Sequence, residues 1–139
     1  MNHSQTPITI LLNDAPRRAM QAHALAHKDK EVAGMMIGPR PEKQPDGFYV
    51  VEIVDYVAAK FTIIRDGSVT ITADSWRYVH IEMAKRHPDH RTCIVGWTHT
   101  HPGFGLFLSE SDLFVQCGFF KQVWQVAAEL DPVARRAGF

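Results

Sequence analysis

The feature that most constrains the fold is an apolar stretch that runs into two histidines and a Pro/Gly-rich turn. Residues 93–97 (CIVGW) are apolar, His99 and His101 follow with one residue between them, and residues 102–105 read PGFG. Side chains alternate across a strand with a period of two, so both imidazoles project from one face of an extended chain. The sequence therefore predicts a strand that carries a two-histidine clamp at its C-terminal end.

A carboxylate follows at a spacing that can complete this clamp. Residues 109–112 (SESD) are typical of a helix start, with Asp112 one turn into the helix, and they also resemble a capping box. Asp112 can therefore fold back onto the two histidines. A single strand histidine is more often an ordinary core residue than a ligand. Two imidazoles and one carboxylate, with a fourth position left to water, form the ligand set of a catalytic zinc site.

Composition excludes several other classes of protein. The 139 residues suffice for one domain, expected over 1–139, and 15 basic against 15 acidic side chains leave no net charge to attract nucleic acid or a membrane surface. Cys93 and Cys117 lie in apolar stretches, so we expect buried thiols in a reducing compartment. No targeting segment or apolar run of membrane-spanning length is recognised, which predicts a cytoplasmic protein.

The first part of the chain reads as a strand followed by a helix. We expect a strand over 8–12, a cap at Asn13 or Asp14, and a helix to about Lys28. The residues expected on its buried face are Met20, Ala24 and Leu25. His23 and His27 have the spacing of a helical zinc motif, but alanine stands where that motif needs glutamate, which favours two surface histidines.

Hydrophobic patterning and breakers predict the remaining elements. We expect central strands over 31–38 and 48–57, a hairpin turning at Asp66-Gly67, helices over 73–86 and 109–119, and a last strand over 123–130. Asp74 or Ser75 would cap the helix over 73–86, with Val79, Met83 and Trp76 on its buried side. Residues 131–139 read as a tail with little order. Strands with interspersed helices indicate an α+β or three-layer α/β/α domain.

The spacing of the polar residues is similar to a known signature. Glu31, then His99-x-His101, seven residues, Ser109, two residues and Asp112 resemble the pattern of the JAMM (MPN+) zinc isopeptidases. Residues 96–105 (GWTHTHPGFG) resemble especially the proteasome-lid and signalosome catalytic subunits, although Thr98 stands where those usually carry tyrosine. The resemblance implies an MPN domain of the α+β class, with a cytidine-deaminase-like mixed sheet flanked by helices.

The same resemblance implies a role for each residue of the pattern. His99, His101 and Asp112 would hold one zinc ion, which lowers the pKa of a bound catalytic water. Glu31 would take the proton of this water and deliver it to the leaving amine. The hydroxyl of Ser109 would stabilise the oxyanion. By itself, a carboxylate such as Glu31 at the start of a strand is usually just solvated.

The substrate implied by the resemblance is a ubiquitin or ubiquitin-like protein with a glycine-rich C-terminal tail, cleaved from a lysine conjugate or from its precursor. Residues 58–71 would hold this tail by adding a strand, although an ordinary hairpin is an equal interpretation of that stretch. The residues expected to contact substrate are Phe61, Ile63, Ile64, Val69, Ile71, Trp97 and Phe104. The short chain resembles stand-alone members of bacterial ubiquitin-like conjugation systems, some serving in antiphage defence, with activating and conjugating enzymes as further partners.

Two alternatives remain open at this point, and a third is excluded. The same zinc site could act on a sulfur-carrier protein or a small peptide, which an unstructured or absent insertion at 58–71 would favour. A metal-free MPN scaffold is a second alternative, but such domains typically lack the ligands that are present here. A nucleoside deaminase would also use zinc and glutamate, but the chain lacks the Pro-Cys-x-x-Cys ligand pair.

Overall fold

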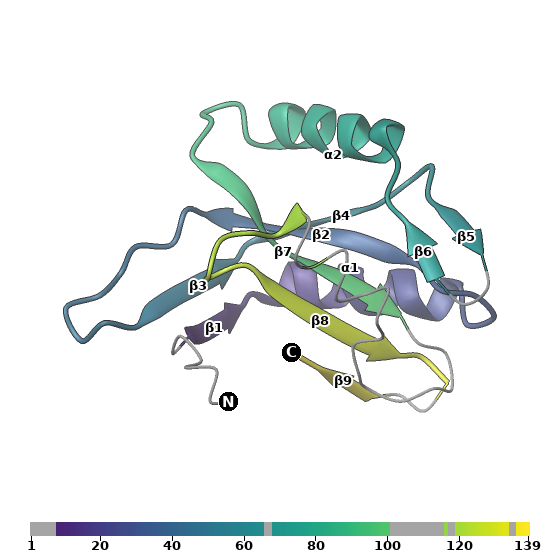
Figure 1. Ribbon diagram of the computed structural model, residues 1–139, viewed down its shortest axis with the longest axis horizontal. Coiled ribbons are helices and arrows are strands. Elements are labelled where there is room, and N and C mark those ends of the chain that lie inside the picture. The colour runs from purple at the N-terminus through teal and green to yellow at the C-terminus, as the bar shows by residue number, and fades with distance from the viewer. Residues whose placement is uncertain (1–7, 66–67, 101–115, 117–118, 134–135) are drawn as a thin grey trace.

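A five-stranded mixed sheet lies at the centre of the structure (Figure 1). The computed structural model describes residues 8–65, 68–100, 116, 119–133 and 136–139. The strand order is β4-β2-β7-β8-β9, with bounds Asp55–Ala58, Ala33–Pro39, Thr92–Thr100, Val126–Asp131 and Arg136–Gly138. The β7–β8 pair is parallel, and the other pairs in this sheet are antiparallel.

β2 and β7 each lie between two other strands of the sheet, and both are largely buried. Every residue of β2 except Pro39 is buried, as are the last six residues of β7. Gly96 lets β7 approach β8 closely, since a Cβ atom there would lie 2.1 Å from the carbonyl oxygen of Val126. The predicted central position of residues 31–38 is confirmed, although the strand itself begins at Ala33.

The predicted second central strand over 48–57 is wrong, because the chain changes sheets within it. β3 (Tyr49–Ile53) pairs in parallel with β1 (Ile8–Leu12) in a separate two-stranded sheet, whereas β4 forms an edge of the five-stranded sheet. Between them, the backbone N–H of Val54 donates to the carbonyl of Ile37 at 2.8 Å. β1 has the predicted bounds.

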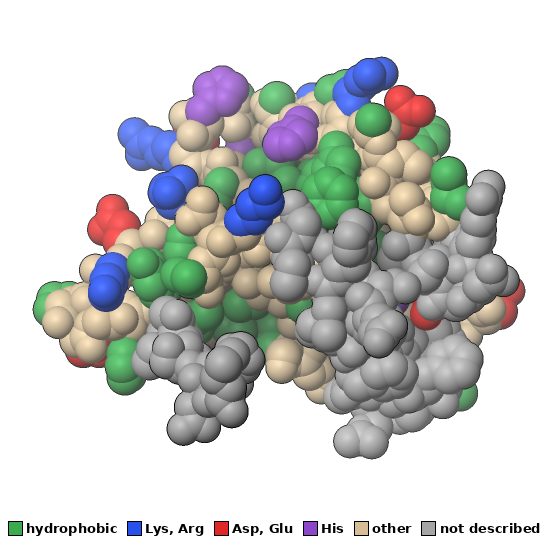
Figure 2. Space-filling model, in the orientation of Figure 1, with side chains coloured by type: hydrophobic (Ala, Val, Ile, Leu, Met, Phe, Trp, Pro, Cys, Tyr) green, Lys and Arg blue, Asp and Glu red, His purple; other side chains and the backbone are tan. Residues whose placement is uncertain are grey.

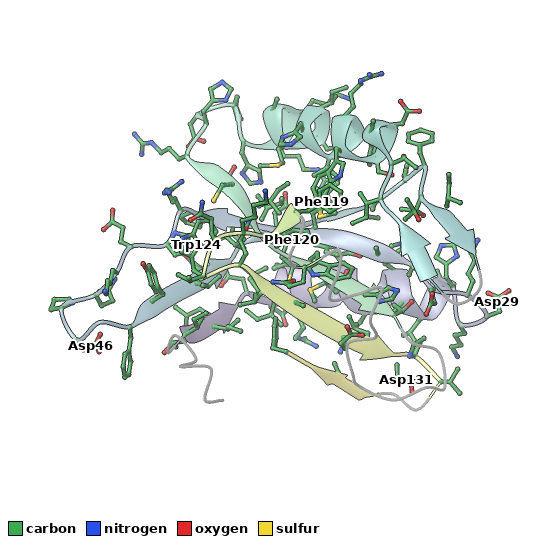
Figure 3. All side chains as sticks on the ribbon, viewed as in Figure 1. Asp29, Asp46, Phe119, Phe120, Trp124 and Asp131 are labelled. Atoms are coloured by element: carbon green, nitrogen blue, oxygen red, sulfur yellow. The ribbon has the colours of Figure 1, made fainter. Side chains whose placement is uncertain are left out.

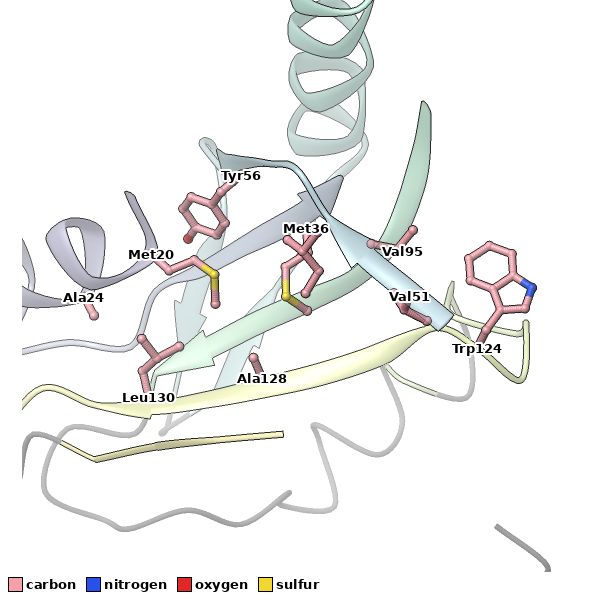
Figure 4. Close-up of a cluster of buried hydrophobic side chains, with 10 residues drawn as sticks. Met20, Ala24, Met36, Val51, Tyr56, Val95, Trp124, Ala128 and Leu130 are labelled. Atoms are coloured by element: carbon pink, nitrogen blue, oxygen red, sulfur yellow. The ribbon is translucent and has the colours of Figure 1, made fainter. Parts of the chain in front are cut away.

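Two helices cover opposite faces of the sheet (Figure 1). α1 (Asp14–Ala26) packs on a cluster that we call the α1-side core, drawn in Figure 4. Its buried members include Met20, Ala24, Met36, Val51, Ile53, Tyr56, Val95, Trp124, Ala128 and Leu130. Met20 and Ala24 are buried as predicted, whereas Leu25 is 45% exposed, which corrects its assignment to the inner face.

α2 (Ala73–Arg86) packs on the other cluster, the α2-side core. Its buried members include Met35, Ile37, Val57, Ile71, Val79, Trp97 and Phe120. The helix has the predicted bounds, but its cap is Thr72, whose hydroxyl accepts from the backbone N–H of Ser75 at 3.1 Å. Ser75 is fully buried instead and donates to the carbonyl of Lys60, so neither it nor Asp74 is the cap.

The predicted hairpin is present and the predicted loose tail is wrong. β5 (Ile63–Arg65) pairs antiparallel with β6 (Ser68–Thr70), and the Asp66-Gly67 turn lies outside the described residues. In the tail, β9 pairs antiparallel with β8 and extends the central sheet. The predicted helix over 109–119 also lies mostly outside the described residues. Within that range the structure describes Gln116 and Phe119, and both are helical.

Two expectations drawn from composition can be compared with this fold. No helix in the described part of the chain is long and apolar enough to cross a membrane. Cys93 is only half-buried, whereas burial had been expected, and Cys117 lies outside the described residues. Burial still raises the pKa of the Cys93 thiol, against the opposing charge of Arg40, so the neutral thiol is favoured.

Candidate active site

The antiparallel pairing of β2 and β7 brings Glu31 beside His99. Ala33 lies opposite His99 in this register, so the residues just before β2 pass the C-terminal end of β7. The backbone N–H of Val32 donates to the hydroxyl of Thr100 at 2.7 Å, and the N–H of Thr100 donates to the carbonyl of Val32 at 3.0 Å. These contacts fix the backbone on which the Glu31 carboxylate is carried.

The two polar side chains face each other inside the protein. Oε2 of Glu31 lies 3.7 Å from Nε2 of His99, which is longer than a direct hydrogen bond. His99 is 1% exposed and Glu31 is 8% exposed. Burying a carboxylate and an imidazole costs free energy unless polar contacts compensate. Buried ionisable groups of this kind are common at catalytic sites. At this separation both side chains can contact one small group, such as a water molecule or an ion.

Aromatic stacking sets the plane of the His99 ring. The ring of Trp97 stacks on it with centroids 5.5 Å apart and 16° between the planes. Phe120 stacks on Trp97 at 5.6 Å and 8°. The indole Nε1 of Trp97 donates to Oε1 of Gln116 at 2.6 Å, which anchors the stack to the segment that follows the motif.

Gln116 is a contributor that the sequence reasoning missed. A signal was available, because Gln116 comes four residues after Asp112 and so shares its face on the predicted helix. Nε2 of Gln116 also donates to the carbonyl of Gln125 at 3.2 Å, and Nε2 of Gln125 donates to the carbonyl of Ile94 at 3.0 Å. The chain of amides therefore connects the segment after the motif to both β7 and the start of β8.

Buried carboxylates on β8 were missed as well. Glu129 pairs with His99 in the parallel β7–β8 register, which places the two side chains on one face of the sheet. Glu129 is 6% exposed and Asp131, two residues further along β8, is 2% exposed. Figure 3 shows Asp131 at the end of β8. The signal was an acidic residue inside the apolar run 126–130, which the strand prediction treated as neutral.

The predicted ligands and catalytic groups are only partly described. Glu31 and His99 are brought together, whereas His101, Ser109 and Asp112 lie outside the described residues. Within the described ranges, no group of three or more His, Cys, Asp or Glu side chains is placed to hold a metal ion. The described donors fit zinc by their chemistry, since an imidazole nitrogen is a common zinc ligand and a carboxylate lies beside it.

The residues predicted to contact substrate fall into separate groups. Phe61 is 64% exposed and Ile63 is 44% exposed, so both are available at the surface beside the hairpin. Ile71 is 6% exposed and Trp97 is fully buried; this corrects their predicted role, because both side chains pack in the α2-side core. Ile64 and Val69 face each other in the β5–β6 register, but their side chains, like all of Phe104, lie outside the described set.

The start of the inserted segment is tied to α2. Phe61 adopts a left-handed backbone conformation with φ of 63°, which is unfavourable for a bulky residue. Its carbonyl accepts from the hydroxyl of Thr72 at 2.7 Å, and its ring contacts Tyr78 edge-on at 6.2 Å. The α2 cap therefore also holds the strained residue that leads into β5.

His23 takes part in a polar network on the face of β7 opposite His99, although a surface position had been expected for His23 and His27. Nδ1 of His23 lies 2.6 Å from the hydroxyl of Tyr56, which lies 3.2 Å from the hydroxyl of Thr98. Burial, with a smaller effect from His27, lowers the pKa of His23 to about 4. Burial also raises the pKa of Tyr56. His23 is thus a neutral partner of the sheet, and its treatment as a surface residue is corrected.

Comparison with known proteins adds an independent line of evidence. The model of the family described as JAB1/Mov34/MPN/PAD-1 ubiquitin protease matches residues 11–123. Ubiquitin carboxyl-terminal hydrolase RPN11 of Saccharomyces cerevisiae is 30% identical over 132 residues, covering 92% of this chain and 40% of that protein. The 26S proteasome regulatory subunit RPN11 of Encephalitozoon cuniculi is 29% identical over 130 residues, covering 90% and 40%. The chain spans about 40% of the length of these relatives.

A solved structure shares the fold. The solution structure of protein DSY2949 from Desulfitobacterium hafniense superposes with a TM-score of 0.63 and covers 94% of this chain and 80% of that one. The two sequences are 16% identical, so this likeness concerns the arrangement of helices and strands alone.

Proposed function

The chain belongs to the JAB1/Mov34/MPN/PAD-1 ubiquitin protease family, and we propose that it is a zinc-dependent isopeptidase acting on ubiquitin or a ubiquitin-like protein. The observation that carries the proposal is the buried pair at the end of β7, with 3.7 Å between Oε2 of Glu31 and Nε2 of His99. Burying a carboxylate and an imidazole together costs free energy, which favours a catalytic site over a non-catalytic scaffold.

The proposed zinc ligands are His99, His101 and Asp112. His101 is two residues beyond His99 and would share its face if the chain stays extended. A helix over 109–119 would put Asp112 on the same face as Gln116, and Gln116 contacts Trp97, the neighbour of His99 on that face of β7. This contact supports a carboxylate ligand approaching from the side of β7 that carries His99.

The proposed mechanism assigns the proton transfers to Glu31. When bound, zinc would supply Lewis-acid chemistry, making a nearby water more acidic and polarising the scissile carbonyl. Glu31 would accept the proton of that water and pass it to the departing lysine amine. Its backbone is immobilised by the Val32–Thr100 contacts, so the carboxylate stays beside His99 through both transfers. The hydroxyl of Ser109 would donate to the oxyanion.

The β5–β6 hairpin supports a protein tail as substrate. An extended C-terminal tail can pair with a strand edge of this hairpin, and Phe61 and Ile63 offer exposed apolar contacts beside it. A narrow groove would favour glycines next to the cleaved bond. An unstructured or absent insertion would favour the alternative of a sulfur-carrier protein or small peptide, whereas β5 and β6 pair with each other here.

The proposal includes the partners and the compartment of the enzyme only in broad terms. We place the enzyme among activating and conjugating enzymes of a ubiquitin-like protein, in the cytoplasm. Service in a bacterial antiphage pathway stays a prediction, since it is based on the sequence resemblance.

The test is cleavage of a ubiquitin-like protein fused through its C-terminal tail to a reporter. We expect the purified chain to cleave the fusion, a strong chelator to stop cleavage, and added zinc to restore it. A matched fusion with the tail glycines replaced by leucines should resist cleavage. Cleavage that continues unchanged in chelator would contradict a zinc mechanism, and equal cleavage of both fusions would contradict the narrow groove.

A further inference from the structure

A cleft lies at the opposite end of β7 from His99. Its volume is about 620 Å³, and it opens between the C-terminal half of α2, the start of β7 and the turn before β8. Thr92 lines the cleft and lies seven residues before His99 in the same strand, a separation of roughly 20 Å in extended chain. The cleft is therefore separate from the candidate active site.

Cationic and histidine side chains dominate the polar lining. Arg40, His80, His87 and His90 line the cleft, and no Asp or Glu is among its described lining residues. Figure 2 shows His, Lys and Arg side chains gathered over the end of α2 from which the chain turns toward β7. Asp55 lies next to the lining, where it is already engaged by His87 at 2.8 Å and by Arg86 at 3.3 Å.

Arg40 is held in place but keeps its charge available. Its guanidinium lies 5.7 Å from the ring centre of Trp124, which is 5% exposed. Figure 3 places Trp124 in the turn just before β8. In the part of the chain that the structure describes, Arg40 forms no ion pair with a carboxylate. An arginine stacked on an aromatic ring still presents N–H donors along its edge, suited to a carboxylate or phosphate.

The thiol of Cys93 carries no negative charge that would neutralise Arg40. Cys93 lines the same cleft, and burial raises the pKa of its thiol although the charge of Arg40 acts in the other direction. The thiol therefore stays neutral and supplies no counter-charge. The apolar side chains of Met83 and Ile94 complete the wall. A cleft of this size, with apolar side chains beside polar and cationic ones, has room for a small molecule.

We propose that this cleft binds a small organic ligand through an oxyanion group, either a carboxylate or a phosphate, with Arg40 as the anchoring residue. This inference goes beyond the proposed isopeptidase activity and does not depend on it. The ligand's apolar part would lie on Met83 and Ile94, while its anion meets Arg40 and the neighbouring histidines.

The test is a titration of the chain as purified, followed by ¹H–¹⁵N NMR at constant ionic strength. Inorganic phosphate and acetate are the two probes, and sodium chloride is adjusted to keep the salt constant. We expect saturable shifts of the Trp124 indole N–H and of the Cys93 amide. In Arg40→Gln the apparent dissociation constant should rise about tenfold or more, as expected for loss of a charge-assisted hydrogen bond.

Matched variants separate this site from general charge effects. Arg77 is an exposed arginine on α2 that pairs with Asp74, and Arg77→Gln should leave the titration unchanged. Saturation by phosphate alone would identify a phosphate-bearing ligand, by acetate alone a carboxylate, and by both an oxyanion site of either kind. Shifts that never saturate, or that are the same in wild type and Arg40→Gln, would overturn the proposal.

Discussion

The imidazole of His99 rests against the indole of Trp97, and this contact explains why a fully buried aromatic residue matters to the site. The stack from Phe120 through Trp97 to His99 fixes the plane of the imidazole, whose Nε2 lies 3.7 Å from Oε2 of Glu31. A binding group needs such support to stay in its productive geometry. Trp97 is therefore a positioning residue, whereas Glu31 is the group proposed to handle protons.

Trp97→Phe tests this support at a single hydrogen bond. The ring stack is largely kept, but Gln116 loses the indole donor that lies 2.6 Å away. We expect the free energy of unfolding to fall by about 1–3 kcal/mol, from the unsatisfied amide and the lost volume. Urea denaturation of the zinc-loaded protein measures the change.

Trp76→Phe is the matched control. In the described part of the chain, the buried Nε1 of Trp76 has no hydrogen-bond partner. Removing it loses some packing but also removes a buried unsatisfied donor, so stability should change by less than about 1 kcal/mol. Equal losses in both variants would mean that the Trp97–Gln116 bond contributes nothing beyond ring size.

α1 and β4 are joined to β7 by polar contacts as well as by apolar packing. The hydroxyl of Tyr56 lies between His23 on α1 and Thr98 on β7, next to the apolar side chains shown in Figure 4. Gly34 on β2 makes room for this ring, since a Cβ atom there would lie 2.0 Å from the Tyr56 hydroxyl oxygen. The elements behind the site are thus held together by a network in which burial keeps His23 neutral.

Acid should weaken this network in a defined pH range. The pKa of His23 is about 4 in the folded chain against 6.5 for an ordinary histidine, so between these values the unfolded state binds more protons. Stability should therefore fall by roughly 1–2 kcal/mol as the pH drops from 6.5 to 4, with no further loss from His23 below that. Urea denaturation across this range, compared between wild type and His23→Gln, isolates the contribution.

His80→Gln serves as the control for that comparison, because His80 is exposed on α2. It should keep the wild-type dependence of stability on pH, whereas His23→Gln should flatten it. The same dependence in all three proteins would show that His23 does not titrate with folding.

Gly34→Ala tests the close approach of β4 to β2. The new methyl group would overlap the ring of Tyr56, which is 6% exposed and has little space to move. We expect a loss of at least about 1–3 kcal/mol in the free energy of unfolding, because the Tyr56 ring must shift to relieve the overlap. Gly47→Ala is the comparison: it has open space around it but φ of 85°, so it should cost about 1 kcal/mol from the backbone alone.

Local patterns in the sequence were enough to find most of these elements. α2 ends where Pro88 prevents continuation, and the Asp66-Gly67 pair marks the hairpin between β5 and β6. The break at Val54 could not be predicted, because residues 48–57 form one β-prone run. Its two halves differ in their partners, since β3 pairs with β1 and β4 pairs with β2. β9 is three residues long, too short to show a period, and it depends on the edge of β8.

Part of the candidate site was predictable from the resemblance to a known signature. The proximity of Glu31 to His99, 68 residues apart, was expected on that ground, because a carboxylate such as Glu31 taken alone is usually just solvated. The positioning role of Trp97 could not be predicted, since an aromatic residue beside a ligand can either pack in the core or bind substrate. The network of His23, Tyr56 and Thr98 is tertiary, because it exists only when α1 packs across β4 and β7.

Taken as a whole, the molecule is an MPN-type α+β domain whose site forms where the start of β2 meets the end of β7. Helices cover both faces of the sheet that carries this candidate site, and the inserted hairpin adds exposed apolar residues. The curated relatives extend well beyond the length matched here, so the chain corresponds to the part of them that carries this domain.

The most direct test of the central claim compares wild type with Glu31→Gln by elemental analysis for zinc and by cleavage of the fused ubiquitin-like protein. The substitution removes the carboxylate but leaves the proposed ligands His99, His101 and Asp112 in place. We predict one zinc per chain in both proteins and cleavage only by wild type, at least about a hundredfold faster. Equal turnover by Glu31→Gln, or wild type that binds no zinc, would contradict the account.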